Sequence, residues 1–264
     1  MVETIPVIEG SLTTPRVRRI TLDHPWQWLM AGWKDTLRTP FASLFYGAAF
    51  VFMGYFVTFI VTQSFQMALA LTTGFMLAGP FLAMGLYDLS RALEKDETPS
   101  LFQSLFAWRH NLMAILLFGI AIGLIMIIWA RLSALLFAAI FLDTTSSVDS
   151  SAANIFFSGD GLVFLLVFAA VGAVLSLLVF SISVVSIPMM LDSDTDVITA
   201  VATSVLAVKV NVGPMILWAA LIVVFTGVGL ATFYLGLAIT MPLIGHATWH
   251  AYRDIVFLSK HQAV

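Results

Sequence analysis

The apolar stretch NLMAILLFGIAIGLIMIIWARLSALLFAAIFL, residues 111–142, carries one charged side chain, that of Arg131. About 20 apolar residues suffice to cross a bilayer core of about 30 Å, and this stretch would form a helix of about 48 Å. An arginine at the bilayer centre costs about 2.5 to 3.5 kcal/mol, whereas near the interface its guanidinium can reach water. We therefore expect the span to end near Trp129 and residues 132–142 to form an outer interfacial or re-entrant helix.

The composition indicates a membrane protein throughout. Of the 264 residues, 60% are hydrophobic and 10% are charged, and the mean hydropathy is +1.00. A soluble domain has about 25% charged residues, so this chain could not cover a soluble surface without large apolar patches. The net charge of −3 gives no reason to expect nucleic acid as a partner, and the lack of cysteine excludes disulfides and Cys-ligated metals. The predicted class is an all-α polytopic membrane protein.

Further apolar blocks bring the expected number of spans to six. The last block, residues 213–245, is either one helix of about 50 Å or two short spans that turn near residues 227–229. We favour two spans, because a single helix would place Arg253 and Lys260 outside. The expected spans are residues 41–62, 65–92, 111–129, 161–190 and the two halves of 213–245.

Basic residues identify the cytoplasmic side of this arrangement. The chain has 12 Lys and Arg residues, and all except Arg131 fall in the termini or in connections of one sidedness. Because Lys and Arg are retained in the cytoplasm, we expect both termini to be cytoplasmic, in the bacterial inner membrane, with the polar loop 143–160 outside. The expected domains are a tail at 1–24, a single six-span membrane domain at 25–256 and a tail at 257–264.

A short amphipathic segment precedes each odd-numbered span on the cytoplasmic side, and such helices lie in the headgroup plane. In the first segment, apolar residues recur at helical spacing: Trp26, Leu29, Met30, Trp33 and Leu37. The second covers residues 101–108 after an expected cap at Thr98, and the third covers 197–206. The three segments end in basic residues, Arg38, Arg109 and Lys209.

The spacing of these basic residues predicts a repeat. Arg38 and Arg109 are 71 residues apart, whereas Arg109 and Lys209 are 100 apart, and the excess of 29 is the length of segment 132–160. We therefore expect three helical hairpins, each preceded by its interfacial helix, around a pseudo-threefold axis along the membrane normal. The units are 25–97, 98–191 with 132–160 as an outer insertion, and 192–256.

The stretch Gly79-Pro80-Phe81-Leu82-Ala83-Met84-Gly85-Leu86-Tyr87, together with the six-span plan, supports a family resemblance. The chain resembles the bacterial integral membrane family called domain of unknown function 2189, which implies an inner-membrane protein and brings no site residues to carry over. Some members carry the label cytochrome c oxidase subunit I, which implies an association with a respiratory complex. A haem–copper subunit needs six histidines inside its helices, and this chain has five in total, so it is not the catalytic subunit.

His246 and His250 are candidate metal or haem ligands, because residues four apart share one face of a helix. No HEXXH pattern accompanies them. We favour the alternative that both lie at the inner interface and anchor the last helix, and we expect no metal and no cofactor. Asp88 and Arg91, three apart near the inner end of the second span, are expected to form an ion pair or, alternatively, part of a proton or solute site.

The fourth span contains several serines, among them Ser176, Ser181 and Ser183. They could line a polar path, although hydroxyls in spans more often bond between helices. The chain has no Walker loop, no Gly-x-Ser-x-Gly motif and no pair of buried carboxylates, so we expect no enzymatic activity.

The outer insertion is the candidate contact surface, because insertions in repeat proteins often form the binding face. We expect it either to dock on another membrane protein or a second copy of this chain, or to cover the ends of its own helices. The contact residues would be Leu136, Phe137, Phe141, Phe156 and Phe157.

Two functions remain open from the sequence. The first is a non-catalytic accessory or scaffold protein of the inner membrane, with the lipid bilayer as its constant partner and a respiratory complex as a further one. The alternative is a small-solute or lipid transporter, which the parallel repeats and the repeated prolines suggest. A tightly packed apolar centre would favour the scaffold, and a polar cavity at mid-depth would favour transport.

Overall fold

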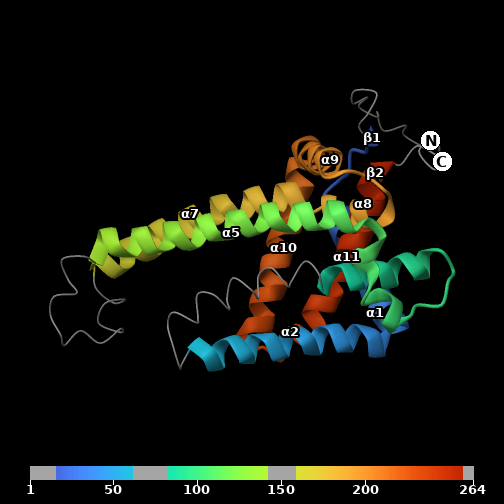
Figure 1. Ribbon diagram of the computed structural model, residues 1–264, viewed down its shortest axis with the longest axis horizontal. Coiled ribbons are helices and arrows are strands. Elements are labelled where there is room, and N and C mark those ends of the chain that lie inside the picture. The colour runs from blue at the N-terminus through green and yellow to red at the C-terminus, as the bar shows by residue number, and fades with distance from the viewer. Residues whose placement is uncertain (1–15, 62–81, 142–158, 258–264) are drawn as a thin grey trace. The chain divides into compact units, whose positions relative to one another are not determined.

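The computed structural model describes residues 16–61, 82–141 and 159–257 and is almost entirely helical over these residues (Figure 1). This confirms the all-α class. The chain forms two compact units. The first contains Met1–Gly119 and Ser181–Val264, and the second contains Ile120–Phe180. Pro80, Phe156 and Phe157 lie outside the described residues.

The described elements are helices of different lengths, with one short strand near each end of the described chain. In chain order they are β1 (Arg16–Val17), α1 (His24–Arg38), α2 (Pro40–Val61), a helix over 82–94, α4 (Leu101–Ser104), the 3-10 helix η1 (Ala107–Asn111), α5 (Leu112–Phe141), α7 (Gly159–Ser183), α8 (Ser186–Asp192), α9 (Val197–Val210), α10 (Val212–Ala231), α11 (Leu237–Ile255) and β2 (Val256–Phe257).

Four helical segments of the described chain are long and apolar enough to cross a membrane. They are Pro40–Phe59, Ala107–Phe141, Gly161–Asp192 and Val212–Ala231. They agree with the expected first, third, fourth and fifth spans. The expected second span begins in residues that the structure does not describe, and the C-terminal half of α11 is polar.

Helix α5 corrects the expected break at Trp129. It runs without interruption for 30 residues, through Arg131 to Phe141, so the separate helix expected to begin at Leu132 is wrong. The Ser133 hydroxyl donates to the carbonyl of Trp129 inside the helix, and no Gly or Pro follows Gly123 before the end of α5. An arginine near a water interface does not itself break a helix, because its side chain can extend along the helix to water.

The last apolar stretch forms two helices, as expected, but they turn later than the predicted residues 227–229. Helix α10 ends at Ala231, and the chain reverses over Thr232–Gly236. Phe233 and Tyr234 adopt positive φ values of 54° and 68°, which cost free energy for residues with a side chain. Contacts to α2 hold this turn, because the Tyr234 hydroxyl bonds to Thr58 at 2.8 Å.

The interfacial segments are helical to different extents. Helices α1 and α9 form as expected, and Asp196 caps α9 by accepting from the Thr199 amide. The second segment forms only the short pieces α4 and η1, and its cap is Ser100, which accepts from Gln103, rather than Thr98. A hydroxyl at residue 100 lies three residues before the amide it caps, as an N-cap requires.

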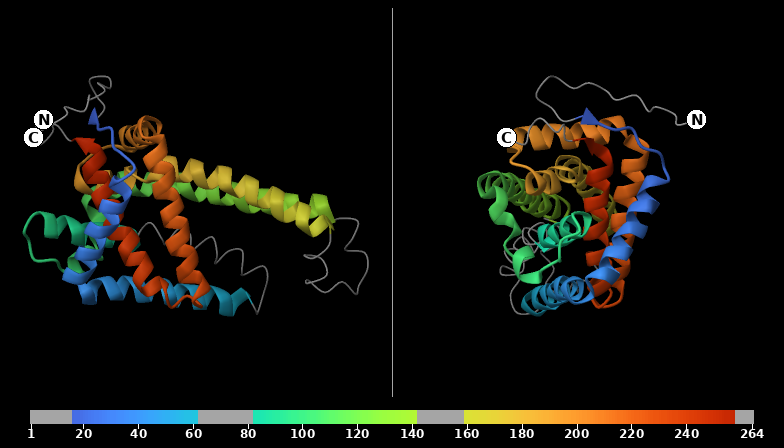
Figure 2. Two further views of the ribbon diagram at one scale, coloured as in Figure 1. Left: turned by 180° about the vertical axis from the view of Figure 1, so that it is seen from behind. Right: turned by 90° about the vertical axis from the view of Figure 1, so that its right-hand side faces the viewer.

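Single non-helical residues join α1 to α2 and α9 to α10. Thr39, between α1 and α2, has φ −123° and ψ 50°, and Asn211, between α9 and α10, has φ −124° and ψ 42°. At both places the chain turns sharply from one helix into the next (Figure 2). The two junctions therefore share one backbone conformation.

Helix α11 lies at the centre of the first unit, against α1, α2 and α10. Small residues allow the close approach: a Cβ on Gly32 of α1 would lie 2.6 Å from the Ala247 nitrogen, and Gly47 of α2 lies directly against Ala238. The two ends of the described chain meet beside this core, because β1 and β2 pair antiparallel. Val17, which the sequence places in a tail, is buried there.

Candidate functional site

A cluster of polar side chains lies buried in the first unit, between α1, α2, the helix over 82–94 and α11. His246 is 0% exposed, Ser43 and Ser90 are each 1% exposed, and Asp35 is 5% exposed. Buried polar groups need hydrogen-bond partners, because leaving one unpaired costs about 1 to 3 kcal/mol. The sequence alone did not single out Asp35, Ser43 or Ser90.

Asp35 and His246 are joined through Ser90. The Ser90 hydroxyl donates to Asp35 Oδ2 at 2.7 Å, and the hydroxyl oxygen of Ser90 also lies 2.7 Å from His246 Nδ1. His250, one turn further along α11, places its Nε2 2.7 Å from Asp35 Oδ2. Both histidines therefore face α1, as their spacing of four predicts, and one carboxylate serves both.

The second ring nitrogen of His246 points to the junction between α1 and α2. Its Nε2 lies 3.0 Å from the Ser43 hydroxyl, which is 2.9 Å from the hydroxyl of Thr39. Thr39 in turn donates to the backbone carbonyl of Asp35 at 2.9 Å. The bonds thus form a closed loop that begins and ends at Asp35.

The carboxyl group of Asp35 is held in its charged form. Burial opposes ionisation, but the hydrogen bonds from His250 and Ser90, with the positive charge that the histidines can carry, outweigh it, so the pKa of Asp35 lies below its ordinary value of 3.8. Helix α1 carries Asp35 on the same face as the buried Trp28 and Gly32. A carboxylate on the buried face of an amphipathic helix is the sequence signal that could have identified this site.

The geometry does not favour a metal ion at His246 and His250. Both ring nitrogens of His246 are already bonded to serine hydroxyls, and no group of three or more His, Cys, Asp or Glu side chains in the described chain could hold a metal. The two histidines also differ from the expectation that both anchor the helix at an interface. His246 is fully buried, and only His250, with its side chain 28% exposed, reaches solvent.

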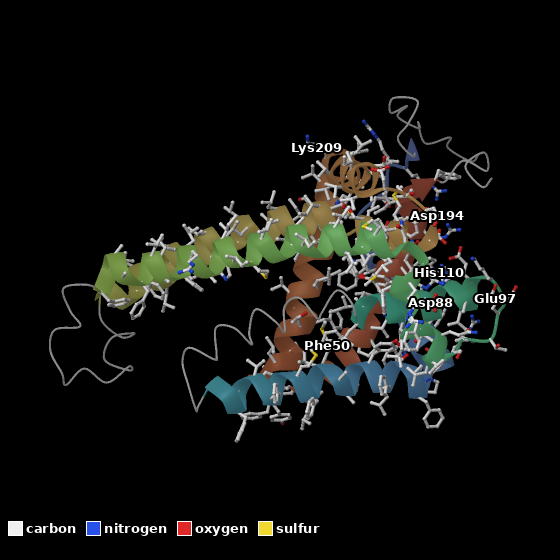
Figure 3. All side chains as sticks on the ribbon, viewed as in Figure 1. Phe50, Asp88, Glu97, His110, Asp194 and Lys209 are labelled. Carbon is white, nitrogen blue, oxygen red and sulfur yellow. The ribbon has the colours of Figure 1, made fainter. Side chains whose placement is uncertain are left out.

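Asp88 and Arg91 form the expected ion pair, at 2.6 Å. Arg91 also donates to the carbonyl of Leu191 at 2.8 Å and lies 3.1 Å from the His110 ring. Asp88 and His110, labelled in Figure 3, are brought together by this arginine. The pair therefore links the end of the helix over 82–94 to the end of α8, a structural role.

A second group of charges joins the same helix ends to α11. Arg253 donates to Glu94 at 2.8 Å and to Asp192 at 3.2 Å. Trp249 donates to Glu94 at 2.9 Å and the Tyr252 hydroxyl to Asp192 at 3.0 Å. The C-terminal ends of three helices, over 82–94, α8 and α11, thus converge on one hydrogen-bonded cluster.

The serines expected to line a path do not come together in one described unit. Ser176 is exposed on α7 in the second unit, whereas Ser181 and Ser183 belong to the first. The carbonyl of Ser181 accepts from Ser204 at 2.8 Å, and the Ser204 hydroxyl accepts from the Val185 amide at 3.2 Å. These bonds satisfy the backbone where α7 ends and α8 begins.

The expected contact residues of α5 pack partly within the second unit. Phe141 is 2% exposed, and its ring lies 5.6 Å from that of Phe164 on α7. Phe137 lies 5.7 Å from the same ring but remains 40% exposed. Leu136 is half-buried. The α5–α7 hairpin therefore buries one side of the predicted surface and exposes the other.

The fold and composition define a polytopic integral membrane protein. Residues 67–192 match the model of the family DUF2189, described as a predicted integral membrane protein. This confirms the resemblance over slightly less than half of the chain. No curated protein and no solved structure gives a match. Ser90 lies inside the matched segment, whereas Asp35, Ser43 and His246 lie outside it.

Proposed function

We propose that this protein is a non-catalytic accessory or scaffold protein of the bacterial inner membrane, which crosses the bilayer six times as three hairpins. Three returns of the chain support the six spans. Tyr46 of α2 packs against Leu86 and Leu89 of the helix over 82–94. Phe141 of α5 packs against Phe164 of α7. Helix α11 follows α10 in the chain and packs against both α10 and α1.

The pairing of β1 with β2 supports the same plan. It holds Arg16 opposite Phe257 and Val17 opposite Val256, so the segments before the first span and after the last lie on one side. The chain between them must then cross a membrane an even number of times. We propose that this side is the cytoplasm, because the basic residues gather there and Lys and Arg are retained on the cytoplasmic side.

Helix α1 supports the bilayer as the constant partner. Its outer face exposes an apolar stripe at helical spacing, Trp26, Met30, Trp33 and Leu37, each between 45% and 60% exposed. Lys34 and Arg38 are exposed beside this stripe, and neither has an ion-pair partner among the described residues. Tryptophan with exposed cations is the composition of a helix in the headgroup plane.

The observation that carries the scaffold proposal is the length of the α5–α7 hairpin. The 30 residues of α5 span about 45 Å, against about 30 Å for the bilayer core. A tilt of about 48° would be needed to fit it, beyond the observed range of about 0 to 40°. Arg131, about 28 Å from the start of α5, then lies at the outer interface, and residues 132–141 extend beyond it.

The extended tip is apolar where water would be expected. Leu135 is 65% exposed and Phe137 is 40% exposed on α5, and Leu162 of α7 is 59% exposed. Exposed apolar surface of this kind marks an interaction site. We infer that the tip docks on the outer part of another membrane protein, and the label carried by some family members makes a respiratory complex the first partner to examine.

Substitution of the exposed tip residues tests this proposal. Leu135→Ser with Leu162→Ser removes exposed apolar surface from the tip and leaves the rings of Phe137, Phe141 and Phe164 in contact. The control is Leu116→Ser with Leu117→Ser, two exposed positions nearer the start of α5. We expect the tip variant, purified in mild detergent, to lose its co-purifying membrane protein while the control retains it. Partners retained by both would refute docking, and loss of self-association between differently tagged copies would identify a second copy instead.

Single cysteines test the topology, because the chain has no cysteine of its own. An impermeant thiol reagent applied to intact cells should label Ser150→Cys and spare Ser259→Cys. Labelling at 259 with none at 150 would overturn the orientation.

One observation favours the alternative of a small-solute or lipid transporter. The buried Asp35 and His246 are ionisable groups inside a membrane protein, where such groups commonly serve transport. Proteoliposomes with an internal pH dye test it. Proton uptake that depends on an added solute and disappears in Asp35→Asn would support transport over the scaffold.

A further inference from the structure

The hydrogen-bond loop around His246 allows its protons to be counted. Each hydroxyl supplies one proton, and each observed bond needs one. On the Asp35 side, the Ser90 hydroxyl donates its proton to the carboxylate. The contact between Ser90 Oγ and His246 Nδ1 at 2.7 Å therefore needs a proton on Nδ1. This fixes one N–H of the imidazole.

The Thr39 side requires a second proton on the ring. Thr39 donates its proton to the carbonyl of Asp35, so the 2.9 Å contact between Thr39 and Ser43 needs the proton of Ser43. Nothing then remains for the 3.0 Å contact between Ser43 and His246 Nε2 except a proton on Nε2. A neutral imidazole would leave one of these three contacts as two facing lone pairs.

We propose that His246 is a buried proton-binding site, whose imidazolium form completes every bond between Asp35, Ser90, Ser43 and Thr39. The ligand is a proton from the side on which His250 is exposed. This inference concerns unit 1 alone and does not depend on whether the protein acts as a scaffold or a transporter.

Two effects of opposite sign act on the charge of His246. Burial lowers its pKa to about 4, and the carboxylate of Asp35, one hydroxyl away, works against that shift. Among the described residues, α2 and the helix over 82–94 bond to the ring through the hydroxyls of Ser43 and Ser90. On α11 itself, His250 bonds to the same carboxylate and is partly exposed, so protons can pass from solvent along His250, Asp35 and Ser90.

The bound proton acts at the joint between α1 and α2. Ser43 and Thr39 connect the His246 ring of α11 to this joint, and Thr39 is its non-helical residue. Loss of the proton breaks one bond of the loop and loosens the surface helix from the first span. Protonation at this site therefore couples the pH of the cytoplasmic side to the position of α1.

Nitrogen NMR of the full-length protein in detergent, with ¹⁵N-labelled histidine, tests the proposal directly. Both ring nitrogens of His246 should be protonated at acidic pH, and one of them should lose its proton as the pH rises. The signals are assigned with His246→Gln or, if that variant does not fold, by replacing the other histidines one at a time. A single protonated nitrogen even at about pH 4, where half of the site should be charged, would overturn the proposal.

Two hydroxyl variants separate the site from general effects. Ser43→Ala removes the acceptor of Nε2–H and should weaken the proton affinity of His246 about tenfold, since one bond to a charged group is lost. Thr36→Val is the matched control, because the Thr36 hydroxyl bonds only to Gly32 within α1, and it should leave the affinity unchanged. An unchanged affinity in Ser43→Ala would also refute the proton count.

Discussion

Replacing Gly32 by alanine should separate α1 from α11 and open the Asp35 cluster. The added Cβ would lie 2.6 Å from the Ala247 nitrogen and 2.8 Å from the Leu243 carbonyl oxygen. Both are backbone atoms, which cannot rotate away, and ordinary contact begins at 3.4 Å. Helix α1 must therefore move by about 0.8 Å, the difference between 3.4 and 2.6 Å.

That movement weakens the bonds on either side of Gly32. The Asp35–His250 bond of 2.7 Å would lengthen to about 3.5 Å, where little of it remains. Overpacking costs about 1 to 3 kcal/mol, and a lost bond to a charged group costs about 1.5 to 3 kcal/mol. The higher helix propensity of alanine returns about 1 kcal/mol. We expect the free energy of unfolding to fall by about 1.5 to 5 kcal/mol.

Gly227→Ala on α10 is the matched control, because no atom lies within 4 Å of its added Cβ. The free energy of unfolding should stay the same or rise by up to about 1 kcal/mol. Both variants can be measured by denaturant unfolding in detergent, followed by the fluorescence of the buried Trp28 and Trp218. Equal stabilities, within about 0.5 kcal/mol, would refute the close packing of α1 on α11.

The remaining predictions concern charge. Asp35→Asn should lower the free energy of unfolding near pH 7 by about 1.5 to 3 kcal/mol, because Ser90 and His250 lose a charged acceptor; thermal unfolding in detergent measures this. The pKa of Asp35 is lowered from 3.8 on folding, so the stability that its charge contributes is complete above about pH 4 and disappears as the pH falls through the lower folded pKa. At such acidic pH, Asp35→Asn should therefore cost less stability than near pH 7. Replacing the exposed Arg38, Arg109 and Lys209 together by glutamine should reduce retention of anionic phospholipid in native mass spectrometry, whereas Lys95→Gln should not; equal retention would contradict headgroup binding.

Periodicity and charge predicted those parts of the fold that local physics decides. The stripe of Trp26, Met30 and Trp33 predicted α1 and its exposed face, and the position of Arg253 predicted that the last apolar stretch must turn. The break expected at Trp129 was wrong, because the cost of a charge in lipid limits where a bilayer lies along a helix and not where the helix ends. The residue Ser100 was missed as a cap because Thr98-Pro99 offered a similar local signal.

The buried site could be predicted only in part. The spacing of His246 and His250 predicted one shared face, and both histidines do face α1. Their partners, Asp35 and Ser43, are more than 200 residues earlier in the chain, and no local pattern specifies which helix will pack against α11. Tertiary contacts therefore decided whether the histidines met a metal, lipid headgroups or a carboxylate.

The junction asparagines show how the first unit closes on itself. Asn111, at the start of α5, donates to the carbonyl of Thr195 at 2.9 Å, just before α9. Asn211, at the start of α10, donates to the carbonyl of Arg18 and accepts from the Ile20 amide, both at 2.9 Å, just before α1. Each asparagine thus fixes the segment that leads into another interfacial helix. The second of these joins residues nearly 200 positions apart in the chain. A chain lacking residues 16–20 would therefore leave the buried Asn211 without those two partners.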